Sequence, residues 1–241
     1  MLKTIPIGTE DFKKIIEDNF YYVDKSLVIE ELFKNNNTVA LFPRPRRFGK
    51  TLFISMLDNF FNIEKKESNK NLFKDLKIYK SDYYKYFGSY PVIKLNFKSL
   101  KQDNFEIMYG AFKEMIRELY EEKRYLMEIM TNEEMQIYSN FLDKSALIEE
   151  YQKSIKFLGD LLYKYYNKKV IILIDEYDVP IQQGYLNNFY NDIVSFIREV
   201  FSNSLKGNEN LEMCIMTGVL RISKESLFSD LNNVKVYSIV N

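Results

Sequence analysis

The sequence predicts an α/β domain in which a mainly parallel, five-stranded sheet is covered by helices on both faces. Three observations predict it: five short, almost wholly apolar runs, amphipathic helical patterns between them, and few chain breakers. The 241 residues include only 8 Gly and 5 Pro, and no low-complexity linker divides them. Apolar strands that alternate with helices are typical of parallel sheets buried on both faces. The length suits one such domain over residues 1–241.

The expected strands are the five apolar runs at 38–42, 91–97, 169–174, 212–216 and 234–239. Helices are expected where apolar residues recur at spacings of three and four, at 51–61, 104–123 and 145–166. The long stretch 101–168 between the second and third strands reads as three or four helices, and we expect it to form a helical insertion. Residues 1–37 form an N-terminal segment.

The composition limits the available chemistry. The chain has no histidine and a single cysteine, Cys214, which excludes Ser-His-Asp catalysis, histidine zinc sites, internal disulfides and four-cysteine clusters. Any reaction must use carboxylates, Lys, Arg, hydroxyls or an oxygen-bound metal. Cys214 lies within an apolar run, so we interpret it as a core residue rather than a nucleophile.

The overall charge indicates neither a nucleic acid nor a membrane as a partner. Lys plus Arg and Asp plus Glu balance at 34 each, whereas a strong nucleic-acid binder normally has a basic face. The first twenty residues contain seven charged side chains and no secretory apolar segment, and no apolar run is long enough to span a bilayer. A soluble, cytoplasmic protein is expected.

The segment after the first strand carries the first candidate site. It reads RPRRFGKT over residues 44–51 and leads into a helix. Its second half matches the end of the phosphate-binding pattern GxxxxGK[ST], in which a glycine frees backbone amides, a lysine reaches phosphate oxygens and a hydroxyl binds Mg²⁺. Arg44 stands where the pattern has its first glycine. The alternative is a glycine-ended turn with a solvated basic surface.

The third strand ends in Asp175 and Glu176 after five aliphatic residues. Carboxylates at the end of a buried strand cost free energy unless they pair with a cation or accept hydrogen bonds. At a phosphoryl-transfer site, the first carboxylate would hold the Mg²⁺ shell and the second would polarise water. The alternative is that Asp175 caps the following turn and Glu176 is solvated. The two patterns support each other, because each lies at the end of a strand in one sheet.

The fourth strand ends near Thr217, and Arg221 follows. If this strand lies between the other two, the Thr217 hydroxyl would point at the terminal phosphate and Arg221 would stabilise transferring charge. The alternatives are an ordinary strand-end turn and an arginine that pairs with Glu225 or Asp230.

Five blocks in order resemble the predicted AAA-ATPase-like family of bacterial and archaeal proteins. They read IPIG, YVDKS, RPRRFGKT, IDEYDVPI and TGVLRISK at residues 5–8, 22–26, 44–51, 174–181 and 217–224. The resemblance implies an ASCE-type P-loop NTPase domain, a three-layer α/β/α fold with strand order 5-1-4-3-2. The family's own RPRRFGK block also lacks the usual first glycine. Longer members often carry a C-terminal PD-(D/E)xK-like nuclease domain.

The motifs and the resemblance together imply an Mg²⁺-dependent ATP-binding domain that hydrolyses ATP to ADP and phosphate. Thr51 and Asp175 would bind the metal, and the expected catalytic residues are Lys50, Glu176, Thr217 and Arg221. The expected nucleotide-binding residues are Arg46, Arg47, Phe48, Gly49, Lys50, Thr51 and Leu52. ATP is preferred over GTP because of the family and because the chain has no Asn-Lys-x-Asp guanine-reading motif. Residues 5–25 would cover the base.

Two other functions remain open. The domain would either be a nucleotide-binding switch or interaction module without turnover, or be the ATPase part of a DNA-acting nuclease system. Since the chain ends shortly after the fifth strand, we expect the C-terminal lid and effector domain to be absent and the output to act on a partner protein or on that effector.

Overall fold

A five-stranded parallel sheet forms the centre of the molecule. The computed structural model describes residues 3–35, 37–222, 227–228, 231 and 234–237. The strands are β1 (Val39–Pro43), β2 (Val92–Asn96), β3 (Val170–Asp175), β4 (Leu211–Gly218) and β5 (Val234–Val236). Their order is β2-β3-β4-β1-β5, and every neighbouring pair is parallel. Read from the β5 edge, this order is 5-1-4-3-2, the order that the resemblance implies.

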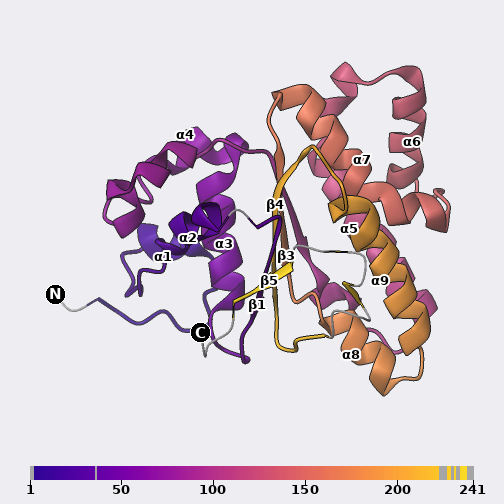
Figure 1. Ribbon diagram of the computed structural model, residues 1–241, viewed down its shortest axis with the longest axis horizontal. Helices are drawn as coiled ribbons and strands as arrows, with labels where there is room; N and C mark the ends of the chain where they lie inside the picture. The colour runs from indigo at the N-terminus through magenta and orange to yellow at the C-terminus, as the bar shows by residue number, and fades with distance from the viewer. Residues whose placement is uncertain (1–2, 36, 223–226, 229–230, 232–233, 238–241) are drawn as a thin grey trace.

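Helices cover both faces of the sheet, which lies between them as a middle layer (Figure 1). One layer consists of α1 (Phe12–Glu17), α2 (Val28–Lys34), α3 (Lys50–Phe61) and α4 (Lys66–Asn69). The other consists of α5 (Phe105–Glu122), α6 (Asn132–Leu142), α7 (Ile148–Tyr166), α8 (Val179–Leu186) and α9 (Tyr190–Leu205). Short 3₁₀ helices connect them: η1 (Ile63–Lys65), η2 (Lys77–Lys80), η3 (Asp82–Tyr86), η4 (Phe97–Leu100) and η5 (Arg124–Ile129).

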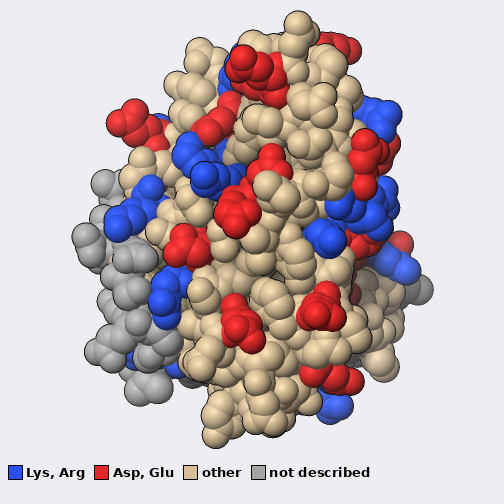
Figure 2. Space-filling view, turned by 90° about the vertical axis from the view of Figure 1, so that its right-hand side faces the viewer, with Lys and Arg blue, Asp and Glu red and all other residues tan. Residues whose placement is uncertain are grey.

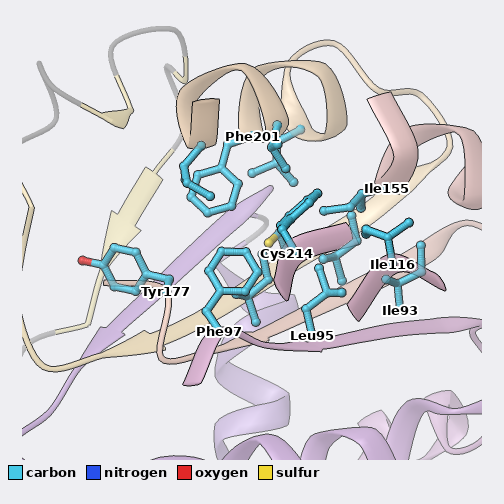
Figure 3. Close-up of a cluster of buried hydrophobic side chains, with 14 of the residues drawn as sticks. Ile93, Leu95, Phe97, Ile116, Ile155, Tyr177, Phe201 and Cys214 are labelled. Carbon is cyan, nitrogen blue, oxygen red and sulfur yellow. The ribbon is translucent and has the colours of Figure 1, made fainter. Parts of the chain in front are cut away.

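The two layers bury two separate apolar cores, one on each side of the sheet. In β3, Ile172 and Ile174 contact the core beneath α5, α7 and α9, and Ile171 and Leu173 contact the core beneath α1 to α3. Side chains alternate across a strand, so a central strand between two cores must be apolar at every position. Figure 3 shows the first core, where Cys214 is enclosed among aliphatic and aromatic side chains. Burial raises the pKa of the Cys214 thiol, and the prediction that it is a core residue is confirmed.

The predicted strands are all present, with small differences at their ends. Strand β4 continues two residues past the predicted range, because Thr217 and Gly218 pair with Phe42 and Pro43 of β1. Hydropathy alone missed this extension, since neither residue is strongly apolar. The last residues of the fifth predicted strand, 238–239, lie outside the described residues.

The stretch between β2 and β3 contains α5, α6 and α7, in agreement with the three or four helices expected there. The predicted apolar stripe of α5 lies in the core, where Met108, Phe112 and Ile116 are fully buried. Helices α8 and α9 were not among the predicted elements. Both follow β3 and lie on the same face of the sheet as α7 (Figure 1); α9 packs against α7, and α8 packs against α9.

The YVDKS block anchors the N-terminal segment. Asp24 accepts hydrogen bonds from the amides of Ser26 and Lys77, and the Ser26 hydroxyl accepts one from the amide of Ile78. Ser26 is fully buried. This block therefore connects the N-terminal segment to η2.

Among the helices that the structure describes, none combines the length and the apolar character that a bilayer crossing would require.

Candidate functional site

The carboxyl ends of four strands bring the predicted chemical residues to one edge of the sheet. Asn96 at the end of β2 pairs with Asp175 of β3, and Thr217 of β4 pairs with Phe42 of β1. The Thr217 hydroxyl donates a hydrogen bond to Asp175 Oδ1, which joins the two pairs into one row. The loop after β1 and the turn after β3 both start from this row, and ligands of open parallel sheets bind at such an edge.

The loop after β1 turns through two left-handed backbone positions. Arg47 has φ 67° and Gly49 has φ 73°, and Gly49 is the N-cap of α3. A Cβ at position 49 would meet nothing within 4 Å, so the glycine is needed for its backbone conformation and not for space. Left-handed residues before a helix N-terminus can direct amides into one concavity, which is an anion-binding geometry.

The Lys50 ammonium lies over this loop. Its Nζ donates to the carbonyl oxygens of Arg44 and Pro45 at 3.2 and 3.1 Å. The Arg44 side chain points elsewhere, donating to the carbonyl oxygens of Pro43 and Tyr237 beside β5. Arg44 therefore connects the loop to the sheet, while Lys50 is held by two neutral acceptors at the mouth of the loop.

A cavity of about 500 Å³ opens between the loop and the turn after β3. Basic side chains outnumber acidic ones on its wall: Arg46, Arg47, Lys50, Lys98 and Lys101 against Glu10, Glu176 and Asp178. The remaining lining residues are Gly8, Thr9, Gly49, Thr51, Leu52, Val179, Gln182, Gln183 and Val219. The excess of cations makes the cavity attractive to an anion.

Asp175 is buried at the base of this edge and is 1% exposed. Its Oδ1 accepts hydrogen bonds from the Thr217 hydroxyl and the Glu176 amide, whereas Oδ2 is enclosed and has no hydrogen-bond partner among the described residues. A buried carboxylate oxygen without a partner is costly. A cation or an ordered water would satisfy it. The described residues contain no cluster of three or more acidic or cysteine ligands, so protein side chains alone could supply only part of a metal shell.

Glu176 lines the cavity beside Asp175 and has a left-handed backbone, with φ 56°. A glutamate adopts this conformation only when the surroundings enforce it, and strain of this kind is concentrated at functional sites. Burial raises the pKa of Glu176, and the Asp175 charge raises it further, while Lys98 and Lys50 oppose the shift. The carboxyl thus lies between an acidic and a basic group of side chains.

Tyr177 and Asp178 connect the turn after β3 to the loop after β4, a contact that the sequence analysis missed. Asp178 Oδ2 accepts hydrogen bonds from the amides of Val219 and Leu220 at 3.0 and 2.8 Å, and from Gln182. The Tyr177 hydroxyl, which points away from the core in Figure 3, donates to the Leu220 carbonyl oxygen. We call these contacts of Tyr177 and Asp178 with residues 217–222 the β3–β4 clamp.

Gly218 makes the β3–β4 clamp sterically possible. A Cβ at this position would lie 2.5 Å from the Tyr177 ring and 2.6 Å from Asp178 Oδ1. Both distances are too short for a real contact, so a side chain at 218 would push the turn and the loop apart.

Of the predicted site residues, Arg46, Arg47, Gly49, Lys50, Thr51, Leu52 and Glu176 line the cavity. Phe48, Asp175, Thr217 and Arg221 are not among its lining residues. Phe48 points into solvent and is 54% exposed. The Thr217 hydroxyl is directed at Asp175 instead of the cavity. Arg221 is exposed beyond the β3–β4 clamp. Its alternative partners, Glu225 and Asp230, lie outside the described residues, as do residues 223–224 of the last sequence block.

Several cavity residues were not predicted. Lys98 follows β2 by two residues, and this position just after a strand end is the sequence signal that could have found it. Gln182 lies on α8, and its position depends on that unpredicted helix. Residues 8–10 were expected to cover a nucleotide base, and the structure places them on the wall of the cavity.

The fold and the site define a P-loop-like α/β domain, with a parallel sheet, a glycine-capped helix after β1 and an acidic strand end facing it. The chain belongs to the predicted AAA-ATPase family, whose sequence model matches residues 6–228. It is also 28% identical, over 98% of its length, to a protein from Azotobacter chroococcum mcd 1 described as "uncharacterized protein in vnfD 5′ region". The chain spans 41% of the length of that protein. No solved structure matches it.

Proposed function

We propose that this domain binds ATP with Mg²⁺ and hydrolyses the bond between the β and γ phosphates. One observation carries the proposal: a single cavity at the carboxyl edge of the sheet is lined by Lys50 and Thr51 on one side and by Glu176 on the other. Membership of the predicted AAA-ATPase family supports nucleotide binding. The reaction needs positioning and charge stabilisation more than proton abstraction, so the absence of histidine is no obstacle.

The loop after β1 would bind the phosphates. Its amides would meet the phosphates before the N-terminus of α3, where the helix dipole favours negative charge. The Lys50 ammonium now donates to the carbonyl oxygens of Arg44 and Pro45. A phosphate is a stronger acceptor than a carbonyl, so we expect Lys50 to transfer to the phosphate oxygens. Arg46 and Arg47 add positive charge on the same wall.

Thr51 and Asp175 would hold Mg²⁺ together with phosphate and water oxygens. The residues fit this ion, because hydroxyl and carboxylate oxygens are the donors it prefers and Asp175 Oδ2 is buried without a hydrogen-bond partner among the described residues. When bound, Mg²⁺ would neutralise charge on the phosphates. The Thr217 hydroxyl, which donates to Oδ1, fixes the orientation of the Asp175 carboxylate and leaves Oδ2 without a hydrogen-bond partner among the described residues.

Glu176 would orient and deprotonate the attacking water. A base works best when its pKa approaches the working pH, and the burial that raises the pKa of Glu176 moves it in that direction. Lys98 and Lys50 keep positive charge beside the carboxylate, which favours its ionised form near neutral pH. Thr217 and Arg221 keep supporting roles in this proposal, Thr217 through Asp175 and Arg221 through the loop that follows β4.

Binding is tested by titrating ATP and Mg²⁺ into the protein and following the melting temperature and the heat of binding. We expect Lys50→Ala to abolish the response. The matched control is Lys153→Ala, which removes an exposed lysine of α7 outside the cavity and should leave binding unchanged. No response in the unmutated chain would refute the proposal.

Hydrolysis is tested separately with Glu176→Gln. Loss of a general base typically lowers a rate by about 10² to 10⁴-fold, so we expect phosphate release to fall at least about 100-fold while ATP binding persists. If the unmutated chain binds ATP and releases no phosphate, the domain is a nucleotide-binding switch without turnover.

We propose that the nucleotide state acts on a partner protein or on an effector segment. In its support, more than half of the Azotobacter chroococcum relative lies outside the region that this chain matches. A nuclease or other DNA-acting effector would fit the same role. The helix-covered face drawn in Figure 2 has Lys and Arg interspersed with Asp and Glu, without a continuous basic surface. Retention on DNA that falls steeply with added salt would support the nuclease alternative.

A further inference from the structure

Strand β2 leaves one edge of the sheet open. It is the edge strand on one side of the sheet. Half of its backbone N–H and C=O groups point towards β3, as the hydrogen bond from the Ile171 amide to the Pro91 carbonyl oxygen shows. Backbone groups alternate in direction along a strand, so the N–H and C=O groups of Val92 and Lys94 point outward. They have no backbone partner among the described residues.

The chain itself begins a pairing on this edge and then leaves it. Tyr90 donates its amide to the Phe61 carbonyl oxygen and accepts from the Ile63 amide, which forms a parallel bridge with Asn62. After this bridge the chain turns away into η1, and the edge continues unpaired along Val92–Asn96. The edge is therefore able to pair with an additional strand.

A groove runs along the unpaired edge, between β2 and α5. Two cavities of about 760 and 360 Å³ meet there and share Lys94, Asn96, Leu119 and Glu122 in their walls. Helix α5 contributes two parallel stripes with a spacing of four residues. The first is apolar and consists of Ala111, Met115 and Leu119; the second is acidic and consists of Glu114, Glu118 and Glu122. We call this region the β2 groove.

The charges of the β2 groove favour a basic occupant. Glu114 is already paired with Arg117 and Lys144, but Glu118 and Glu122 make no ion pair with any described residue and are exposed. Lys94 does not neutralise them, because its ammonium is directed to Asp58 on the opposite face of the sheet, at 3.8 Å. Of the other lysines in the walls, Lys65 and Lys123 pair with Asp58 and Glu64, and Lys98 interacts with Glu176. Two carboxylates without an ion pair thus lie beside an apolar stripe.

We infer that the β2 groove binds an extended segment of a partner protein that adds a strand to β2 and carries Lys or Arg at every second position. Side chains of an added strand that face α5 would lie over Ala111, Met115 and Leu119. Long basic side chains suit this surface, because their aliphatic stems cover apolar residues while their charged ends reach Glu118 and Glu122.

A second copy of this chain is a poorer occupant. Antiparallel pairing of two β2 strands about their centres would place Lys94 opposite Lys94 and bring two acidic stripes together, and like charges directly opposite are destabilising. The inference is independent of ATP binding, since it uses none of the residues assigned to phosphate or metal.

The test uses a fluorescein-labelled, end-capped peptide, Thr-Lys-Val-Lys-Val-Lys-Thr, and a peptide of the same composition in the order Lys-Lys-Lys-Val-Thr-Val-Thr. We expect the alternating peptide to bind at least about tenfold more tightly than the second one. It should also slow hydrogen exchange at the outward amides of Val92 and Lys94, which electrostatic adhesion alone would not do.

Charge reversal locates the binding site. Glu118→Lys combined with Glu122→Lys should weaken the alternating peptide at least about tenfold, whereas the control pair Glu128→Lys and Glu209→Lys, exposed and outside the groove, should not. Both pairs have the same net charge change, and melting curves check that both fold. Absence of binding, equal affinity for the two peptides, binding without protection of β2, or equal weakening by both pairs would each overturn the inference.

Discussion

The loop after β1 and the turn after β3 face each other across one cavity, yet they are built in opposite ways. The loop is exposed and basic, and its lysine is held by two backbone carbonyls of its own segment. The turn is buried and acidic, and Asp175 and Asp178 are each 1% exposed. The β3–β4 clamp attaches the turn to the neighbouring strand, whereas Lys50 can exchange its neutral acceptors for a ligand.

The difference indicates a division of roles. A buried carboxylate must be held by hydrogen bonds before any ligand arrives, because an unpaired charge in the interior is costly. An exposed ammonium remains solvated when no ligand is bound, so leaving it without an ionic partner costs little free energy. We therefore expect substitutions in the turn to affect stability and those in the loop to affect binding, and the following predictions test that expectation.

The largest loss of stability is expected for Asp178→Ala. The substitution removes the acceptor of the Val219 and Leu220 amides and of Gln182. Hydrogen bonds to a charged acceptor contribute about 1.5–3 kcal/mol, and buried amides left unpaired add a penalty. The free energy of unfolding should therefore fall by about 2–4 kcal/mol. Urea unfolding measures this. Asp178→Asn keeps one acceptor oxygen and should cost less; equal losses for both variants would contradict the role of the acceptor.

Gly218→Ala should follow in size. The new Cβ would lie 2.5 Å from the Tyr177 ring, so the β3–β4 clamp must open to admit it. Overpacking of this kind costs about 1–3 kcal/mol. Gly49→Ala is the matched comparison, since its Cβ has free space and only the left-handed backbone is strained. A larger loss at position 49 than at 218 would show that steric contact does not hold the clamp.

Lys50→Ala should change the free energy of unfolding by less than about 1 kcal/mol. Its two hydrogen bonds go to neutral carbonyls at the mouth of an open loop, and water can replace them. The same variant should lose ATP binding completely. A loss of stability comparable to that of Asp178→Ala would remove the contrast between loop and turn.

The smallest effect is a pH dependence at Glu176. Because its pKa is raised in the folded protein, the folded state retains a proton that the unfolded chain has already released. The contribution of this carboxyl to the free energy of unfolding is therefore greatest below the ordinary carboxyl pKa. It falls as the pH rises through the raised pKa of the folded protein. Glu176→Gln should thus stabilise the protein slightly at about pH 8 and lose this advantage towards about pH 4. A difference that grows with acidity would show the opposite shift.

The sequence by itself predicted the five strands, the main helical stripes and both halves of the site. It could do so because these features are local: a central strand must be apolar at each position, and glycine, lysine and threonine follow one another directly in the loop. Asp175 and Glu176 were found in the same way, by their place at the end of an apolar run.

Only the tertiary structure decided which side chains meet. Whether Thr217 faces a phosphate or a carboxylate depends on the register between β3 and β4, and the pairing directs it to Asp175. The roles of Asp178 and Gly218 in the β3–β4 clamp depend on a contact between segments about forty residues apart. Lys98 and the β2 groove depend on β2 being the edge strand. Local sequence patterns determine whether a segment forms a helix or a strand. Strand order and register determine which side chains become neighbours, because order and register result from packing of the whole chain.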